Sequence, residues 1–346
     1  MEFIYLKECF IEGYDSYLSE LVSEFLSKQG LRYDNNTEYT YVLLDVDKVI
    51  ATGSLDGKVI KYVSVEEKYQ GMAITNKIIS HLLNKAYNKG RKQLFVYTKP
   101  KNLDIFLDLG FYKIAEVFDE VVLLENENNG IEKFIKNIPL PKTKGYIISS
   151  VVVNCNPFTL GHQYLIEKAS MDSDWVYVFV VSEDKSDFST EIRFNLVKEG
   201  TKHLKNVTVC QTNDYLISNA TFPSYFLKKY DDAAKIHALL DIEIFTRYFV
   251  PILNINRRYV GEEPLCELTA YYNNTMKSIL PKYGVEVIEL PRKKIGNEVI
   301  SASRVRKLLK EGKIVDVKKI VPLTTYNFLT SSEGQKIIDK IKNSVY

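Results

Sequence analysis

The sequence of 346 residues predicts an α/β protein with two domains, an α+β domain followed by a Rossmann-like domain with a parallel sheet. Domains usually hold about 100–200 residues, so the length accommodates two. Residues 125–130 are polar and lack periodicity, and Ile138-Pro139-Leu140-Pro141 follows them. From Tyr146 onward strand and helix patterns alternate, which is typical of a parallel sheet covered by helices on both faces. We therefore predict domains at 1–126 and 145–346, with a linker over 127–144.

Composition and charge narrow the class of protein. Hydrophobic residues make up 45% and charged residues 26%, as in folded globular proteins. Lys and Arg number 46 against 44 Asp and Glu, so no global basic field indicates nucleic acid or an anionic membrane as a partner. The four cysteines lie far apart without metal-ligand spacing, which favours buried thiols in a reducing compartment. With no basic and apolar leader and no apolar run of about 18 residues, we expect a cytoplasmic protein.

The first domain alternates short elements of both kinds. Apolar residues at helical spacing predict a helix over 14–28, and a second helix begins near Ile74. Turn signals lie at Asp45-Val46-Asp47-Lys48 and at Asp56-Gly57. The remaining predicted elements are strands over 39–46, 58–65, 94–98 and 120–124 and a short helix over 103–109.

This series resembles the GNAT acyltransferase fold, through Tyr69-Gln70-Gly71 before the second helix and Leu109-Gly110-Phe111 later. The resemblance implies a V-shaped sheet and a glycine-rich loop that holds the pyrophosphate of coenzyme A. Ala73 and Thr75 stand where that loop has glycine and then glycine or alanine, which disfavours close approach of a pyrophosphate. We expect a domain that docks a substrate or a partner rather than one that turns over acyl-CoA.

The second domain opens with the stretch on which the functional prediction depends. The apolar run Val151-Val152-Val153 ends in the loop Asn154-Cys155-Asn156-Pro157-Phe158-Thr159, and Leu160-Gly161-His162 then starts a helix over 162–171. A helix N-terminus offers unpaired N–H groups and a partial positive charge, and Gly161 leaves room for a phosphate near the backbone. His162 lies where it can donate to a phosphate oxygen.

Further strands are predicted over 175–181 and 206–211, and a helix over 190–203. Three segments supply charged or capping residues near the same end of the sheet. Lys185 lies in a loop after the strand over 175–181, and Ser189 or Thr190 caps a helix that carries Arg193 in its first turn. The segment 256–264 contains Arg258, Gly261 and Glu262. Near the C-terminus, Ser301 or Ser303 caps a helix with Arg304 and Arg306. In open α/β sheets ligands bind beyond the carboxyl ends of the strands, where strand order reverses.

The Gly161-His162 loop together with Ile300-Ser301-Ala302-Ser303-Arg304-Val305-Arg306 resembles the nucleotidyltransferase superfamily of adenylyltransferases. Thr159 stands at the first motif position, as in the pantetheine-phosphate adenylyltransferase branch. Because a GNAT-like domain precedes this unit, the chain resembles the citrate lyase ligase family along nearly its full length. That family uses ATP and acetate to acetylate the thiol of the phosphoribosyl-dephospho-CoA group on the acyl carrier (gamma) subunit of citrate lyase, releasing AMP and pyrophosphate through acetyl-AMP.

The resemblance implies roles for individual residues. His162, Thr159, Lys185 and Arg306 would act in catalysis by holding or neutralising the phosphates, and Mg²⁺ would be bound on the triphosphate, largely through water and phosphate oxygens. No residue is predicted as a metal ligand. Arg258 and Glu262 are equally compatible with an internal ion-pair network. The residues implied to bind ATP are Asn154, Asn156, Phe158, Gly161, Arg193, Arg258, Gly261, Glu262, Ser301 and Ser303.

Two other functions stay open on the sequence. One is an adenylyltransferase of the pantetheine-phosphate or of the nicotinamide or nicotinate mononucleotide type, in which the acceptor is a phosphate. The other is a GNAT acetyltransferase with an accessory nucleotide-sensing domain. His81, His203 and His237 have no partners at metal or triad spacing, and we assign them no chemistry.

Overall fold

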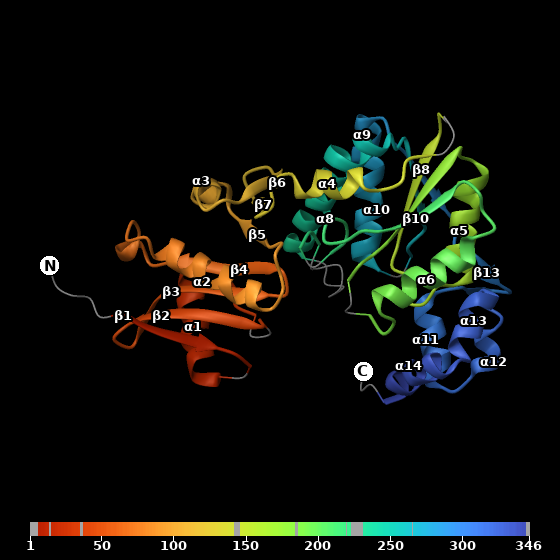
Figure 1. Ribbon diagram of the computed structural model, residues 1–346. Coiled ribbons are helices and arrows are strands. Elements are labelled where there is room, and N and C mark those ends of the chain that lie inside the picture. The colour runs from red at the N-terminus through yellow and green to blue at the C-terminus, as the bar shows by residue number, and fades with distance from the viewer. Residues whose placement is uncertain are drawn as a thin grey trace. The chain divides into compact units, whose positions relative to one another are not determined.

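The computed structural model describes residues 6–13, 15–34, 37–141, 146–183, 186–218, 220–222, 231–264 and 266–343. The chain forms two compact units, Met1–Gly130 and Ile131–Tyr346, and Figure 1 labels their elements. A short helix, α4 (Gly130–Lys136), lies within the residues predicted as linker, and its Ile131 and Ile135 are buried. The predicted α+β fold of the first unit and the parallel sheet of the second are both confirmed.

The N-terminal unit is built on a seven-stranded sheet in the order β1-β2-β3-β4-β5-β7-β6. Neighbouring strands are antiparallel except β4 and β5, which are parallel. The sequence patterns predict β2, β4, β5 and β7. They do not predict the edge strands β1 and β6, and β3 is marked only by the predicted turns on either side of it. The strands are β1 (Leu6–Ile11), β2 (Tyr39–Asp45), β3 (Lys48–Asp56), β4 (Val59–Val65), β5 (Phe95–Thr98), β6 (Tyr112–Val117) and β7 (Val121–Glu125).

Helices cover both faces of this sheet, because successive side chains of a strand point to opposite faces. In β2, Tyr41 and Leu43 pack in the core that includes α2 (Ile74–Asn88). Val42 and Leu44 pack in the core that includes α1 (Ser16–Lys28). A third helix, α3 (Leu103–Asp108), places Phe106 in the core on the α2 side.

The C-terminal unit contains a five-stranded sheet in the order β10-β9-β8-β11-β12, with every pair parallel. The chain runs from β8 through β9 to β10 and then returns to the other side of β8. Strand order therefore reverses between β8 and β11, and a ligand site is expected beyond their carboxyl ends. The strands are β8 (Ile148–Val153), β9 (Trp175–Val180), β10 (Val207–Gln211), β11 (Arg257–Gly261) and β12 (Glu286–Leu290).

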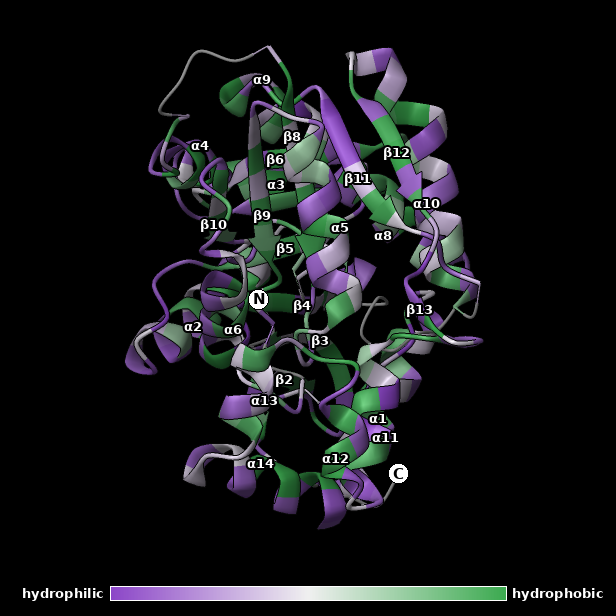
Figure 2. Ribbon diagram, turned by 90° about the vertical axis from the view of Figure 1, so that its right-hand side faces the viewer, coloured by the Kyte–Doolittle hydropathy of each residue, from purple (hydrophilic) through white to green (hydrophobic). Residues whose placement is uncertain are grey.

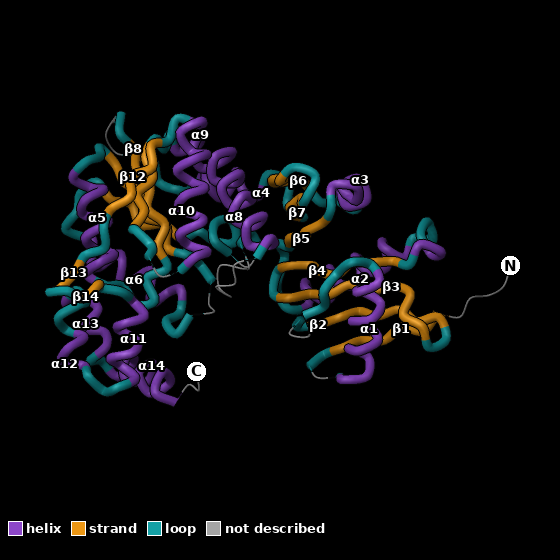
Figure 3. Tube along the Cα trace, turned by 180° about the vertical axis from the view of Figure 1, so that it is seen from behind, coloured by secondary structure: helices purple, strands orange, loops and turns teal. Residues whose placement is uncertain are grey.

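Figure 3 shows helices on both sides of this sheet, as right-handed crossovers in opposite directions require. One side carries α5 (Leu160–Met171) and α6 (Thr190–Thr201). The other carries α8 (Asp232–Ile244), α9 (Val250–Leu253) and α10 (Glu267–Ile279). The elements predicted between residues 146 and 211 agree with β8, α5, β9, α6 and β10 to within about two residues at each end.

The chain ends in a hairpin and four helices that form a separate small core, in which Val305, Leu309, Ile320, Leu329 and Ile338 are buried. Figure 2 shows the purple and green bands of amphipathic helices here. Packing helices over 313–346 are predicted, and the described part confirms them. Within the described ranges, no helix combines the length and apolar character needed to cross a membrane. The elements are β13 (Lys294–Ile295), β14 (Glu298–Val299), α11 (Ala302–Lys310), α12 (Ile314–Val317), α13 (Leu323–Leu329) and α14 (Ser332–Asn343).

Candidate active site

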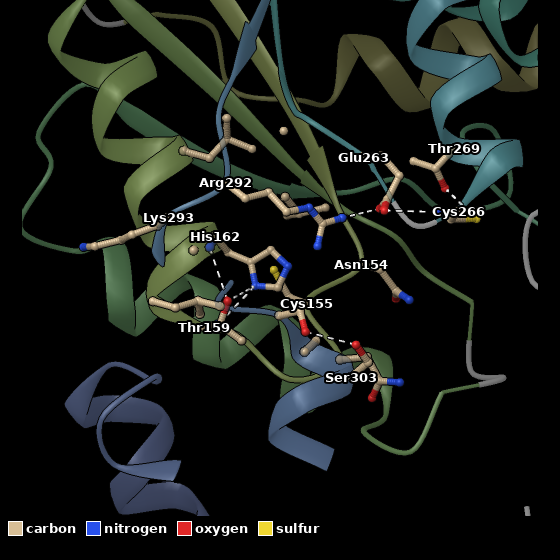
Figure 4. A pocket seen from close by; sticks show the side chains of 18 of the residues that line it. Asn154, Cys155, Thr159, His162, Glu263, Cys266, Thr269, Arg292, Lys293 and Ser303 are labelled. Carbon is tan, nitrogen blue, oxygen red and sulfur yellow. Dashed lines mark hydrogen bonds and ion pairs between the residues drawn. The ribbon is translucent and has the colours of Figure 1, made fainter. Parts of the chain in front are cut away.

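A pocket opens beyond the carboxyl ends of β8 and β11, where strand order reverses (Figure 4). Its volume is about 1320 Å³, above the roughly 300–1,000 Å³ of common small-molecule sites. The walls come from the loop after β8, the first turn of α5, the loop after β11, and the segment from the end of β12 into α11. The predicted residues that line it are Asn154, Asn156, Thr159, Gly161, His162, Gly261, Glu262, Ser301, Ser303 and Arg306.

The loop after β8 is fixed by packing and by a hydrogen bond to a second loop. Phe158 is fully buried, and a Cβ at Gly200 of α6 would stand only 2.4 Å from its ring. Asn156 accepts a hydrogen bond at its Oδ1 from the backbone N–H of Phe188, at 3.1 Å. Phe158 therefore belongs to the core rather than to the pocket wall, and it holds the loop in place.

Helix α5 begins with reciprocal hydrogen bonds between Thr159 and His162. The hydroxyl of Thr159 accepts from the N–H of His162 at 3.4 Å, and the N–H of Thr159 donates to Nδ1 of His162 at 3.1 Å. This is a capping box in which histidine replaces the usual Glu or Gln. Because Nδ1 accepts, the neutral imidazole carries its proton on Nε2. Among the described residues nothing accepts a hydrogen bond from Nε2, so this N–H is available to a ligand.

The environment of His162 keeps the ring neutral. Burial lowers its pKa to about 4, and the positive charge of Arg292 acts in the same direction. At neutral pH the side chain is therefore a hydrogen-bond donor through Nε2 without a net charge.

A second helix N-terminus borders the same pocket. Ser301 caps α11, since its Oγ accepts from the N–H of Arg304 at 3.2 Å. Ser303 follows in the first turn and is exposed. A Cβ at Gly161 would lie 3.3 Å from the carbonyl oxygen of Ile300, so this glycine lets α5 approach the segment that leads into α11. The first turns of two helices thus supply N–H groups and partial positive charge to one cavity.

Arg306 joins α11 to the two loops of the pocket. Its guanidinium donates to the backbone carbonyl of Asn156, and its Nε lies 3.2 Å from Oδ2 of Asp187. Asp187 follows β9 and balances part of the arginine charge. The structure thus brings Arg306, expected on the helix near the C-terminus, to the loop after β8.

Arg193 is predicted to contact nucleotide, but the structure places it beneath the loop and outside the pocket. It is fully buried. Its Nη1 donates to the carbonyl oxygens of Asn154 at 2.9 Å and Val181 at 2.6 Å, and its Nη2 donates to that of Glu183 at 2.6 Å. A buried guanidinium is stable only when its donors are satisfied. Arg193 therefore fixes the carboxyl ends of β8 and β9, and its position gives no support for a nucleotide contact.

Arg258 also lies outside the pocket. It is 3% exposed, and its guanidinium carbon lies 4.8 Å from the ring centre of Phe245. Its charge acts on Asp241, which accepts hydrogen bonds from Tyr272 at 2.6 Å and from the N–H of Ile217 at 2.7 Å. Burial nevertheless raises the pKa of Asp241. Of the two roles open to Arg258, its position supports the internal network.

One predicted residue lies outside the described part of the chain. Lys185 belongs to the loop after β9, and the structure describes that loop only up to Glu183 and again from Ser186. Ser186 and Asp187 both line the pocket.

The sequence patterns miss several basic residues of the pocket wall. Arg292 and Lys293 follow β12, while Lys307 and Lys310 extend the basic face of α11 beyond Arg306. The signal for the first pair is the run Pro291-Arg292-Lys293-Lys294. It marks the carboxyl end of a strand that the sequence patterns do not predict.

Comparisons with known proteins identify sequences and a solved structure that this chain resembles. Residues 130–329 match the family model described as the citrate lyase ligase C-terminal domain. The citrate (pro-3S)-lyase ligase of Klebsiella pneumoniae is 37% identical over 314 residues, covering 90% of this chain and 92% of that protein. A phosphopantetheine adenylyltransferase of Clostridium botulinum is 29% identical over 156 residues, covering 43% of this chain and 94% of that protein. The structure of an acyl-CoA N-acyltransferase from Pseudomonas aeruginosa is 13% identical, covering 36% of this chain and 100% of that one, with a TM-score of 0.31.

Proposed function

This chain belongs to the citrate lyase ligase family, and from this premise we propose that it uses ATP and acetate to acetylate a thiol carried by citrate lyase. The thiol is that of the phosphoribosyl-dephospho-CoA group on the acyl carrier (gamma) subunit, and AMP and pyrophosphate are released. The observation that carries the proposal is the convergence of two helix N-termini, the Nε2–H of His162 and the guanidinium of Arg306 on one pocket.

The chemistry requires activation of acetate, because a carboxylate is a poor electrophile whose leaving group would be oxide. An acetate oxygen attacks the α-phosphorus of ATP, the bond to the bridging oxygen of the β-phosphate breaks, and pyrophosphate leaves. The carrier thiolate then attacks the acetyl carbon, and AMP leaves with the electrons of the C–O bond. Such transfers depend on positioning and on charge stabilisation, and no protein nucleophile is needed.

His162 is the proposed donor to the β- and γ-phosphate side of ATP. The bond from Thr159 to Nδ1 orients the ring with its proton on Nε2. Thr159 is 1% exposed, so its proposed part is to position His162 and to cap α5. Arg306 and Ser303 approach the same phosphates from α11, and Lys185 stays the predicted cation of the loop after β9.

The remaining proposed ATP contacts line the same cavity. Asn154 lies at the carboxyl end of β8 beside the proposed α-phosphate position, and Gly261 and Glu262 lie at the end of β11. Gly161 and Ser301 contribute the backbone of the two first turns, and Asn156 holds the loop between them.

We propose that ATP enters as its Mg²⁺ complex. Four carboxylates line the described pocket, and two of them, Asp187 and Glu263, are engaged by Arg306 and Arg292. Within the described residues no group of three His, Cys, Asp or Glu side chains could hold a metal. These residues suit an ion that is held mainly by phosphate oxygens and water, as Mg²⁺ commonly is.

We assign the N-terminal unit, predicted over 1–126 and joined by the linker 127–144, to docking of the acyl carrier subunit or its prosthetic group. Its strand β4 leads through a loop into helix α2, the strand, loop and helix on which the resemblance to acyltransferases rests, with Gly71 at a φ of 80°. A cytoplasmic location accords with four free cysteines, of which Cys155 and Cys210 are buried. Neither a nucleic acid nor a membrane is a proposed partner.

The test is pyrophosphate release from ATP with and without acetate, with hydroxylamine present to trap acetyl-AMP as acetohydroxamate. We expect release and hydroxamate only when acetate is added. Release that is indifferent to acetate and rises with a phosphate acceptor, such as 4′-phosphopantetheine or nicotinamide mononucleotide, would identify an adenylyltransferase instead. The relative from Clostridium botulinum is the observation that favours this alternative. Consumption of acetyl-CoA without ATP would identify an acetyltransferase.

A further inference from the structure

Arg292 is a fixed cation of the pocket wall that the motifs do not predict. It follows β12, and its Nε donates to the carbonyl oxygen of Glu262 at 2.7 Å. Its Nη2 forms an ion pair with Oε2 of Glu263, whose side chain is 13% exposed. Glu263 in turn accepts a hydrogen bond from the N–H of Cys266 at 3.2 Å, just before α10. The guanidinium is thus held in one orientation by the loop after β11.

One edge of this guanidinium stays open. Among the described residues none accepts a hydrogen bond from Nη1. Figure 4 shows the open edge directed toward His162 rather than toward Glu263. The positive charge of Arg292 also contributes to the lowered pKa of His162, which agrees with their proximity.

The position of Arg292 matters because substitution at phosphorus is in line. In the reaction proposed above, His162 and the first turn of α11 bind the pyrophosphate side of ATP. The attacking oxygen must then approach from the opposite side. Figure 4 places Ser303 of α11 on one side of His162 and Arg292 on the other. Acetate is an anion that must approach a negatively charged phosphate, so a cation on that side lowers the repulsion.

We propose that Arg292 binds the carboxylate of the acid substrate and that Glu263 positions the guanidinium for it. The assignment rests on the proposed function, because it identifies the binding site of the acid in that reaction. A single open edge suits a small monoanion. One carboxylate oxygen accepts from Nη1, and the other is left to attack the α-phosphorus.

The test compares Arg292→Gln with the native protein in two binding measurements. Binding of ¹³C-labelled acetate is followed by NMR in the presence of a non-hydrolysable ATP analogue, and binding of the analogue alone is followed by calorimetry. We expect acetate affinity, and the reciprocal of its KM, to fall by about 10-fold or more, as when a hydrogen bond to a charged group is lost. The Kd of the analogue should stay within about 2-fold.

The matched control is Arg257→Gln. Arg257 forms an ion pair with Glu286 at 2.9 Å, at the opposite end of the same two strands. This variant tests whether the loss of any ion-paired arginine in or next to β11 and β12 alters acetate binding. We expect no change.

Three outcomes would overturn the assignment. The first is equal acetate binding by Arg292→Gln and the native protein, or no acetate binding by either. The second is weaker binding of the ATP analogue with acetate unaffected, which would make Arg292 a phosphate contact. The third is recovery of acetate affinity in the double variant Arg292→Gln/Glu263→Gln, because the loss in the single variant would then come from the charge of Glu263 that Arg292 no longer balances. Failure of acetate-dependent pyrophosphate release with acetate binding intact would instead count against the proposed function alone.

Discussion

Each unit contains a strand, a short loop and a helix, and the two helix starts differ in what surrounds them. In the C-terminal unit, β8 leads into α5, whose first turn is closed by the Thr159 and His162 capping box. In the N-terminal unit, β4 leads through a loop into α2, whose first N–H groups have no side-chain cap. The residue before α2 is Ala73, which has a left-handed φ of 55°.

The cations near the two helix starts are also used differently. Beside α5, Arg306 comes from α11 and Arg292 from the end of β12, and both reach the pocket from far along the chain. Near the start of α2, Lys77 forms an ion pair with Glu8 of β1 at 2.6 Å, within the unit. The structure therefore gathers donors from distant segments at the start of α5 but not at the start of α2, which supports the proposal that only α5 binds an anion.

The sharpest test of this contrast is His162→Ala. It removes the Nε2–H donor, and we expect acetate-dependent pyrophosphate release to fall by about 10²-fold or more, as when a preorganised donor is lost. The matched control is His81→Ala in α2, whose ring packs against those of Phe10 and Tyr39, at 5.1 and 5.7 Å between ring centres. That variant should lower stability and leave the rate unchanged. A His162→Ala rate within about 2-fold of native would remove His162 from the mechanism.

The pH dependence of stability gives the next largest effect. His162 has a pKa of about 4 in the fold against roughly 6.5 in an unfolded chain. Below about pH 6.5 the unfolded chain binds a proton that the folded ring does not, so stability is lost as the pH falls toward 4. Between pH 7 and pH 4.5 this group should remove roughly 2–3 kcal/mol from the free energy of unfolding.

Urea unfolding of the native protein and of His162→Gln at both pH values measures the difference. The other histidines are present in both proteins, so their effects cancel. Equal losses of stability in the two proteins would show that His162 is protonated normally in the fold.

Thr159→Val tests how much the capping box of α5 contributes to stability and to the reaction rate. The variant keeps the buried volume and the backbone N–H that donates to Nδ1, but it loses the hydroxyl that caps α5. We expect a loss of about 1 kcal/mol in the free energy of unfolding and a fall of a few-fold in rate. Thr159→Ser, which retains the hydroxyl, should recover most of both. An unchanged melting temperature in Thr159→Val would show that the cap is unimportant.

Some elements were predictable because their residues are buried on both sides and repeat regularly. Strand β9 is a continuous apolar run, β8 ends in three successive valines, and α5 follows a recognisable loop. Among the strands that the patterns miss, β1, β6 and β12 lie at sheet edges, whereas β3 lies inside its sheet and is marked only by the predicted turns on either side of it. Edge strands pair on one side only and tolerate charged residues. In β12, for example, Glu286 and Glu289 are exposed, which weakens the alternation.

The site was predictable where its chemistry is local in sequence. Gly161, His162, Ser301 and Ser303 belong to two short motifs, and the structure brings both motifs to one pocket. A sequence shows that Arg193 is charged, but it does not show on which side of the loop the guanidinium lies. Arg292 reaches the pocket only because β12 lies beside β11, and that neighbour relation is set by the whole sheet.

The smallest expected effect concerns the N-terminus of α2, which we compare with that of α5. Lys77→Ala removes the cation near the N-terminus of α2, and its ion pair with Glu8 is largely exposed, at 49% and 39% of the two side chains. Exposed pairs contribute about 0–1 kcal/mol, so the melting temperature should change little. Acetate-dependent pyrophosphate release should stay within about 2-fold, because Lys77 neutralises Glu8 rather than a ligand. A loss of rate as large as that of His162→Ala would mean that α2 also binds an anion in the reaction, and the two helix starts would then be alike.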